Sequence, residues 1–246
     1  MMVRSMFTAL MLLTFSAPSL AEPTAVTVRV IARDAKYIGT SMGGVRVTLR
    51  DVATGAVLAH GLTEGGTGDT QKIMQAQGRS PDRAGADAAA FNTSLDIAVP
   101  THVELIAEGP LGFPGSVLRV TQQRWIMPGR AVTEGEGWVV EMPGLVISPQ
   151  TSVADGKVAI SAKVELMCGC PITPGGLWDS ADYAVEASLW ARNGQVAVAP
   201  LAFVTAPGGY EGSVALPGRG SYRLVLFARN IRTGNSGVTE VTVRAD

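Results

Sequence analysis

The sequence predicts an all-β protein made of two β-sandwich domains. Apolar residues alternate with polar ones in many short runs, such as Val26, Val28 and Val30, and this is the period of a strand with one buried face. The 29 glycines and 14 prolines lie between these runs without a fixed period, as expected for turns that join strands. The 246 residues are enough for two domains with their own cores.

Residues 1–21 have the features of a cleaved signal peptide. Arg4 supplies the positive charge, residues 6–15 are uncharged and mainly apolar, and Ala21 ends a small-x-Ala cleavage motif. The apolar run is shorter than the stretch of about 20 residues that a membrane-spanning helix needs. We therefore expect a mature chain that has no membrane span and resides in the periplasm or outside the cell.

The first predicted domain covers residues 22–147. Its strands are expected at residues 26–31, 45–50, 57–62, 95–99, 103–107, 117–120 and 137–142. Residues 125–129 lead into a Pro-Gly turn. The stretch near 71–91 is polar and rich in alanine, with Pro81 in its middle. We expect this stretch to be an exposed, flexible insertion with one helical turn at 87–90.

Residues 45–63, which read VRVTLRDVATGAVLAHGLT, combine an alternating strand, a Thr-Gly turn and a short return strand. This segment resembles the transthyretin-like and carboxypeptidase regulatory-like β-sandwich modules. The resemblance implies a sandwich of the seven-stranded type for the first domain. It implies no catalytic residues.

The second predicted domain covers residues 148–246. Its strands are expected at residues 157–166, 183–191, 201–205, 210–216, 221–228 and 238–244. The closing stretch, GRGSYRLVLFARNIRTGNSGVTEVTVRAD, is similar to the final hairpin of bacterial immunoglobulin-like and fibronectin type III-like domains. The similarity implies that the hydroxyl of Tyr222 bonds back to the backbone.

Charge and motifs exclude several classes of protein. Lysine and arginine number 20 against 21 aspartates and glutamates, without runs of like charge, so we expect no nucleic-acid surface. The sequence contains no Gly-x-Ser-x-Gly elbow, His-Glu-x-x-His motif or dinucleotide fingerprint. We expect His60 and His102 to be half-exposed strand residues and Glu134 and Glu136 to be solvated. No catalytic residue is predicted.

The most distinctive chemistry lies in Met167-Cys168-Gly169-Cys170, which holds the only two cysteines of the chain. One interpretation is a disulfide within the loop, which would add little stability because it closes a very short loop. A second is a soft-metal site in which Met167, Cys168 and Cys170 bind copper(I), an ion that favours sulfur ligands. Thiol redox chemistry is the third. The fourth is a pair of cysteines that pack in the core or join a partner chain.

The loop that follows, residues 171–179, lies between two predicted strands and contains two prolines and a tryptophan. Pro171, Trp178 and Asp179 form the candidate binding surface, because loops held by rigid strands commonly carry recognition residues. The alternative is that Trp178 closes the end of the sandwich.

The sequence therefore predicts an exported, non-catalytic protein that acts by binding, as an accessory or interaction module with a protein or a small ligand as its partner. The first alternative is a copper-handling protein that uses the Met-Cys-x-Cys site, with copper as its cofactor. The second alternative is a thiol-disulfide redox partner.

Overall fold

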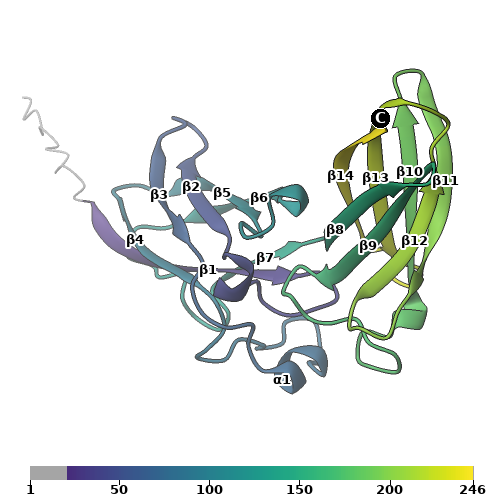
Figure 1. Cartoon of the computed structure of the whole chain (residues 1–246). Coiled ribbons are helices and arrows are strands. Elements are labelled where there is room, and N and C mark those ends of the chain that lie inside the picture. The colour runs from purple at the N-terminus through teal and green to yellow at the C-terminus, as the bar shows by residue number, and fades with distance from the viewer. Residues whose placement is uncertain (1–20, 246) are drawn as a thin grey trace, which may run out of the picture.

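The computed structural model describes residues 21–245, and the chain in this range is all-β, as predicted (Figure 1). The predicted signal peptide, apart from Ala21, lies outside the described residues. Among residues 21–245, no helix is both long and apolar enough to cross a membrane.

Seven strands and three short helices make up the first half of the described chain. They are β1 (Glu22–Ala32), η1 (Thr40–Met42), β2 (Arg46–Asp51), β3 (Val57–Leu62), α1 (Thr70–Met74), β4 (Phe91–Ile97), β5 (Thr101–Gly109), η2 (Pro114–Ser116), β6 (Leu118–Ile126) and β7 (Trp138–Met142). The strands form a sheet with the order β4-β1-β7 and a second sheet with the order β3-β2-β5-β6. We call this unit the first sandwich.

The core of the first sandwich comes from the alternation of its strands. Val28 and Val30 of β1 are fully buried, and so are Val47 and Leu49 of β2 and Leu105 of β5. All five belong to the same hydrophobic cluster, although β1 lies in one sheet and β2 and β5 in the other. The two sheets therefore pack face to face.

The predicted insertion forms a cover on the outside of the three-stranded sheet. Ile73 and Ala88 pack with Tyr37 and with Ile31 of β1 in a second, smaller core. The helical turn predicted at 87–90 is wrong. This stretch is extended, because it pairs with residues 64–66, and the only α-helix among the described residues is α1, which Asp69 caps.

Seven strands and one short helix make up the second sandwich. They are β8 (Leu145–Ala154), β9 (Lys157–Leu166), η3 (Ser180–Asp182), β10 (Tyr183–Ala191), β11 (Gly194–Phe203), β12 (Gly209–Ala215), β13 (Gly220–Asn230) and β14 (Ser236–Ala245). Because β8 begins at Leu145, the predicted division between residues 147 and 148 falls inside this strand. The strands run antiparallel in the order β14-β13-β10-β11-β12-β9-β8.

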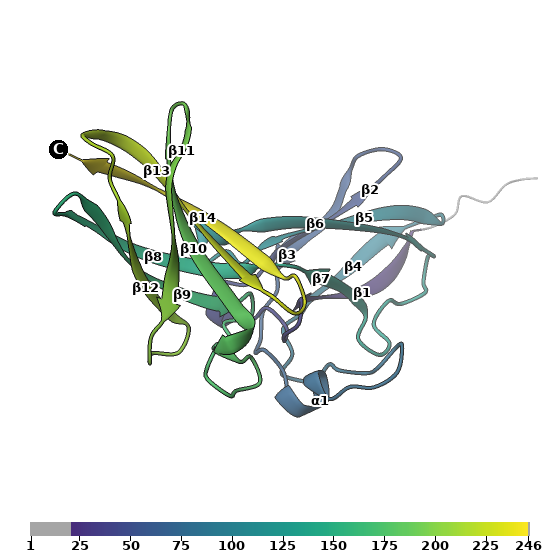
Figure 2. The ribbon, with the colours of Figure 1, turned by 90° about the vertical axis from the view of Figure 1, so that its right-hand side faces the viewer.

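Strand β11 is the corner at which this continuous sheet folds over. Its residues 194–201 pair with β10, and its last two residues pair with β12. Strands β8, β9 and β12 therefore form one layer and β10, β13 and β14 the other (Figure 2). Val158 and Ile160 of β9 are buried in the same core as Leu224 and Leu226 of β13. As predicted, the Tyr222 hydroxyl donates a hydrogen bond to a backbone oxygen, that of Gly218, at 3.1 Å.

Candidate functional site

The two cysteines follow the end of β9 and form a disulfide with each other. Both are buried, with 2% of Cys168 and 5% of Cys170 exposed. Gly169 between them has a φ of +75°, a left-handed conformation that glycine adopts readily. Of the four interpretations, the structure contains the disulfide. Thiol exchange requires access of a thiolate to sulfur, and both cysteines are almost fully buried.

A methionine from the first sandwich lies against this loop. A Cβ atom placed on Gly169 would lie 2.6 Å from the Sδ atom of Met42 in η1. The side chain of Met167 instead packs against Gly144, between β7 and β8. Among residues 21–245, no group of three or more His, Cys, Asp and Glu side chains is placed to hold a metal ion.

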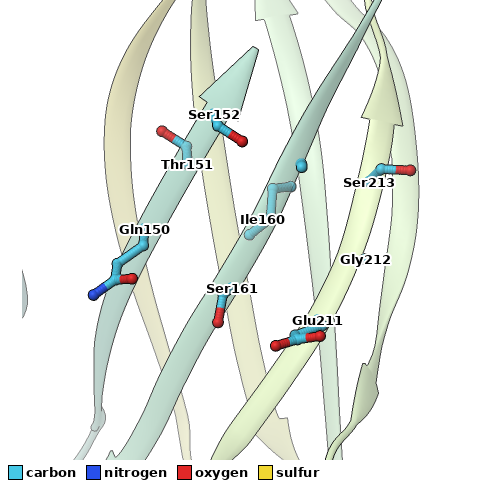
Figure 3. Close-up of a pocket in the computed structure, with 9 residues that line it drawn as sticks. Gln150, Thr151, Ser152, Ile160, Ser161, Glu211, Gly212 and Ser213 are labelled. Carbon is cyan, nitrogen blue, oxygen red and sulfur yellow. The ribbon is translucent and has the colours of Figure 1, made fainter. Parts of the chain in front are cut away.

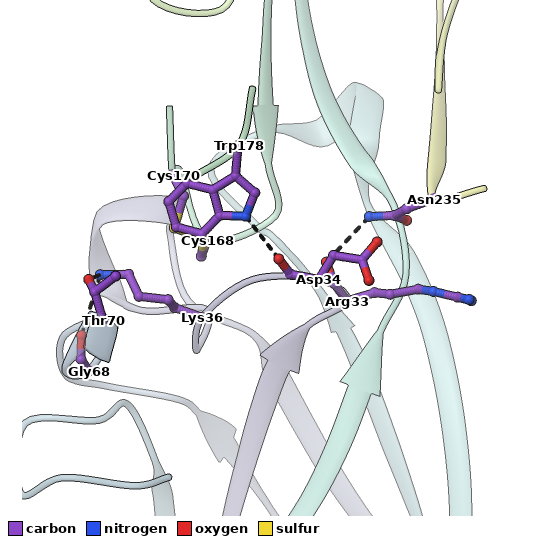
Figure 4. Close-up of a disulfide and its surroundings, with 9 residues drawn as sticks. All are labelled: Arg33, Asp34, Lys36, Gly68, Thr70, Cys168, Cys170, Trp178 and Asn235. Atoms are coloured by element: carbon purple, nitrogen blue, oxygen red, sulfur yellow. Dashed lines mark hydrogen bonds between the residues drawn. A yellow bond between two sulfur atoms is a disulfide. The ribbon is translucent and has the colours of Figure 1, made fainter. Parts of the chain in front are cut away.

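The predicted binding residues share one loop but differ in their surroundings, and Figure 4 shows Trp178 beside Asp34 and the disulfide. Trp178 is half-buried, and its indole N–H donates to the backbone oxygen of Asp34 at 2.8 Å, so this residue joins the second sandwich to the first. Pro171 is exposed. Asp179 accepts the N–H groups of Ala181 and Gly175, and these bonds lower the pKa of its carboxyl. A binding role for Pro171, Trp178 and Asp179 stays a prediction.

Asn235 makes three hydrogen bonds at the junction, the region where the two sandwiches meet. Its Oδ1 accepts from the N–H of Gly144 at 2.7 Å, and its Nδ2 donates to the oxygen of Gly144 at 3.2 Å and to that of Arg33 at 3.3 Å. Only 3% of Asn235 is exposed. One side chain just before β14 thus links the residue that follows β1 with the connection between β7 and β8.

Glu136 is not the solvated carboxylate that the sequence predicts. It accepts a hydrogen bond from the Tyr37 hydroxyl at 2.6 Å and pairs with Arg83 of the insertion at 2.9 Å. Burial raises the pKa of Glu136, but the hydrogen bonds from Arg83 and Tyr37 outweigh burial and hold the pKa below its usual range. Burial and the bond to Glu136 raise the pKa of Tyr37. This cluster anchors the insertion.

A shallow hollow lies on the outer face of β8, β9 and β12 (Figure 3). Gln150, Ser161 and Glu211 lie side by side across the three strands, and the next row contains Ser152 and Ser213. These side chains are short or flexible, and none of the described residues that line the hollow is aromatic. The hollow offers hydrogen bonds but little apolar area to a ligand.

Among the described residues, the most exposed of the large hydrophobic side chains is an aromatic one on β6, in the first sandwich. Trp125 is 64% exposed, and its ring stacks on that of His102 in β5, with 4.9 Å between the ring centroids and 15° between the planes. The residues before it, 121–124, are exposed as well, so five consecutive residues of this strand face solvent. As expected, both histidines lie in strands, His60 in β3 and His102 in β5.

The strand predicted from the sequence ends at residue 120, before this surface begins. Residues 121–124 read Thr-Gln-Gln-Arg and show no apolar alternation, whereas the structure continues β6 to Ile126. The one feature of the sequence that could have indicated this surface is the polar run at 121–124, which is long enough for a strand and is followed by Trp125.

No protein-family model matches the chain, and no curated protein matches its sequence.

Several solved structures resemble the chain over most of its length at low similarity. A DUF3823 family protein from Bacteroides ovatus has 9% identity and a TM-score of 0.35, with 91% of this chain and 100% of that chain covered. A DUF3823 family protein from Bacteroides uniformis has 12% identity and a TM-score of 0.33, with 90% of this chain and 100% of that chain covered. The chicken interferon gamma receptor alpha chain has 10% identity and a TM-score of 0.35, with 92% of this chain and 98% of that chain covered. At these values no argument about function rests on the likeness.

Proposed function

We propose that the mature chain is an exported, non-catalytic binding protein that holds a partner at strand β6 and its exposed tryptophan. The observation that carries this proposal is the exposure of five consecutive residues, 121–125, on a regular strand, the last of them a tryptophan that stacks on His102. Export rests on the signal peptide that residues 1–21 predict.

Trp125 has the properties of a binding anchor. Tryptophan combines a large apolar ring with a polar N–H, and it is enriched among the residues that dominate binding energies. Stacking on His102 restricts the ring before a partner arrives, so less side-chain entropy is lost on binding. The same face carries Gln123, which donates to Glu104 at 3.1 Å, so the ring has polar neighbours with fixed orientations. An exposed apolar group with a polar rim is typical of an interaction site.

The architecture supports an accessory role. The sequence resembles transthyretin-like modules in its first part and fibronectin type III-like modules in its second. Such modules serve adhesion, spacing and the decoration of enzymes alike, so the function must come from the surface. Here Trp178 and Asn235 connect the two sandwiches by hydrogen bonds, and the β6 surface lies on the first of them.

Site-specific crosslinking in the producing cell tests this proposal. A photo-crosslinking amino acid at position 123 should give a saturable adduct with one partner, and the Trp125→Ala change should reduce that adduct at least about tenfold, as loss of an anchor residue does. The same crosslinker at position 192, in the exposed turn between β10 and β11, is the control. Equal adducts at both positions, or an adduct that persists without Trp125, would contradict the proposal.

A copper-binding role is our second proposal, because the sulfur of Met42 lies against the loop of Cys168 and Cys170. Copper(I) would need the two cysteines as thiolates, with Met42 or Met167 as a further sulfur ligand. Anaerobic titration of copper(I) into the reduced protein tests this role. The Met42→Leu and Met167→Leu variants identify the methionine ligand. Binding no stronger than that of the variant in which both cysteines are serine would refute it.

A further inference from the structure

Strand β6 is an edge strand whose unpaired backbone groups can be identified. The oxygen of His102 in β5 accepts the N–H of Val52, so His102 turns its backbone toward β2. Backbone direction alternates along an antiparallel strand, and the even-numbered residues of β5 therefore face β2 while the odd-numbered ones face β6. Val103 pairs with Arg124 and Leu105 with Gln122, so the even-numbered residues of β6 bond to β5.

The odd-numbered residues of β6 must then point their N–H and C=O groups at the free edge. These residues are Arg119, Thr121, Gln123 and Trp125. Within the described part of the chain, their backbone groups make no hydrogen bond to another segment. A row of unpaired donors and acceptors of this kind is the template on which an extended chain adds a strand.

The edge of β6 lacks two of the features with which sheets block such pairing, a bulge and a proline. Its register with β5 runs over nine residue pairs without a bulge, and the strand contains no proline. Bulges and prolines protect edges from added strands.

The stacking of Trp125 directs its open face toward the same edge. Its centroid distance of 4.9 Å from His102 is close to the spacing of neighbouring strands, about 4.8 Å, so the rings stand side by side across the strand pair. His102 covers the ring on the β5 side. A side chain of an added strand would meet the other side of the ring, as cross-strand neighbours do.

The charges around this edge favour an acidic partner. The exposed arginines along β6 and just after it are Arg119, Arg124 and Arg130. The carboxylates nearest to them on β5, Glu104 and Glu108, are already paired with arginines of β2. A partner segment with carboxylates therefore complements the edge, whereas a basic segment does not.

We propose that β6 takes up an extended, acidic segment of a partner protein as a fifth strand of the four-stranded sheet, with an apolar partner side chain on Trp125. This inference rests on the proposed function and names the chemistry of the partner. Main-chain hydrogen bonds to the odd-numbered residues supply affinity, and the arginines and Trp125 select the sequence.

Hydrogen exchange on the mature chain tests the inference without a substitution. The probe is a synthetic peptide of about nine residues, the length of an added strand, that alternates threonine with valine and carries glutamate at both ends. The amides of Thr121, Gln123 and Trp125 exchange freely without the peptide and should become protected at least about tenfold with it. The amides of Gln122 and Arg124, already bonded to β5, should change little. No new protection at the odd-numbered amides would overturn the inference.

Peptide binding to variants supplies the matched comparison. Thr121→Pro removes one edge donor but no bond to β5, and it should weaken binding about tenfold at an unchanged unfolding midpoint. Arg119→Glu should reverse the preference between the acidic peptide and its lysine counterpart, whereas Arg192→Glu, at an exposed turn, should not. Equal binding of both peptides by the wild type would also overturn the inference.

The outcome also separates this inference from the proposed function. If neither peptide binds but a soluble oligosaccharide such as maltohexaose changes the fluorescence of the wild type and not of Trp125→Ala, the binding surface is correct and the added strand is wrong. If Trp125→Ala alters neither peptide nor partner binding, both fail.

Discussion

Asn235 should contribute more to stability than any other polar side chain of the junction. Asn235→Ala leaves the buried N–H and oxygen of Gly144 without their partner, and it also removes the bond to the oxygen of Arg33. An unsatisfied buried backbone group costs about 1–3 kcal/mol. The two groups of Gly144 therefore predict a loss of roughly 2–6 kcal/mol, and water that enters the space moves the loss toward the lower end.

Urea unfolding of the mature chain, followed by fluorescence, measures this loss from the change in the free energy of unfolding. Asn193→Ala is the matched control, because Asn193 is exposed between β10 and β11 and should change stability by less than about 0.5 kcal/mol. If Asn235→Ala and Asn193→Ala have the same effect, the hydrogen bonds of Asn235 do not hold the junction.

The Asn235→Asp variant separates hydrogen bonding from loss of volume. Aspartate keeps the acceptor for the N–H of Gly144 but turns a carboxylate oxygen toward two backbone oxygens. It should therefore destabilise the protein at neutral pH at least as much as alanine does. Protonation restores a donor, so part of the stability should return as the pH falls toward 4. A deficit that does not depend on pH would refute this account.

Three further changes test other parts of the structure. Gly169→Ala should destabilise the protein by about 1–2 kcal/mol because of its left-handed backbone, and further because the new Cβ would clash with the sulfur of Met42. Gly175→Ala is also left-handed but has open space around it, so it should show only the backbone cost when the two variants are compared by thermal unfolding. The fold lowers the pKa of Glu136, so the ionised carboxylate stabilises the protein above the unfolded pKa of about 4.3, and this stabilisation is lost as the pH falls through the folded pKa. In a profile of stability measured from pH 7 to 3, Glu136→Gln should remove this pH dependence. Tyr210→Phe removes a buried hydroxyl that has no hydrogen-bond partner among residues 21–245, and it should leave stability unchanged or higher. Tyr222→Phe should lower stability by about 0.5–1.5 kcal/mol in urea unfolding.

The sequence predicted most strands of the second sandwich because their burial follows a local period. In β9, Val158, Ile160, Ala162 and Val164 are buried, and the residues between them up to Lys163 are exposed. The bond of the Tyr222 hydroxyl was implied by the resemblance to immunoglobulin-like and fibronectin type III-like domains, and it reaches a residue only four positions earlier. Features that depend on a few consecutive residues can be inferred without the fold.

The junction could not be predicted, because its contacts join distant parts of the chain. Asn235 bonds to Arg33 across 202 positions, and Trp178 bonds to Asp34 across 144. The partnership of Glu136 with Arg83 spans 53 positions and leaves no local pattern, so the carboxylate looked solvated. No spacing rule relates such residues before the fold is known.

Strand β6 escaped the sequence analysis for a reason that bears on its function. A strand that packs one face in a core must alternate, but residues 121–125 are all exposed, so no alternation is imposed on them. The hydrogen bonds to β5 hold these residues in place, and none of the five side chains is buried in the core, although Gln122 and Arg124 contact Trp138 of β7. Evolution can therefore select them for a partner. Function is expected where a regular strand lacks the sequence pattern that core packing imposes. Among the strands of the first sandwich, only β6 is exposed at five consecutive positions.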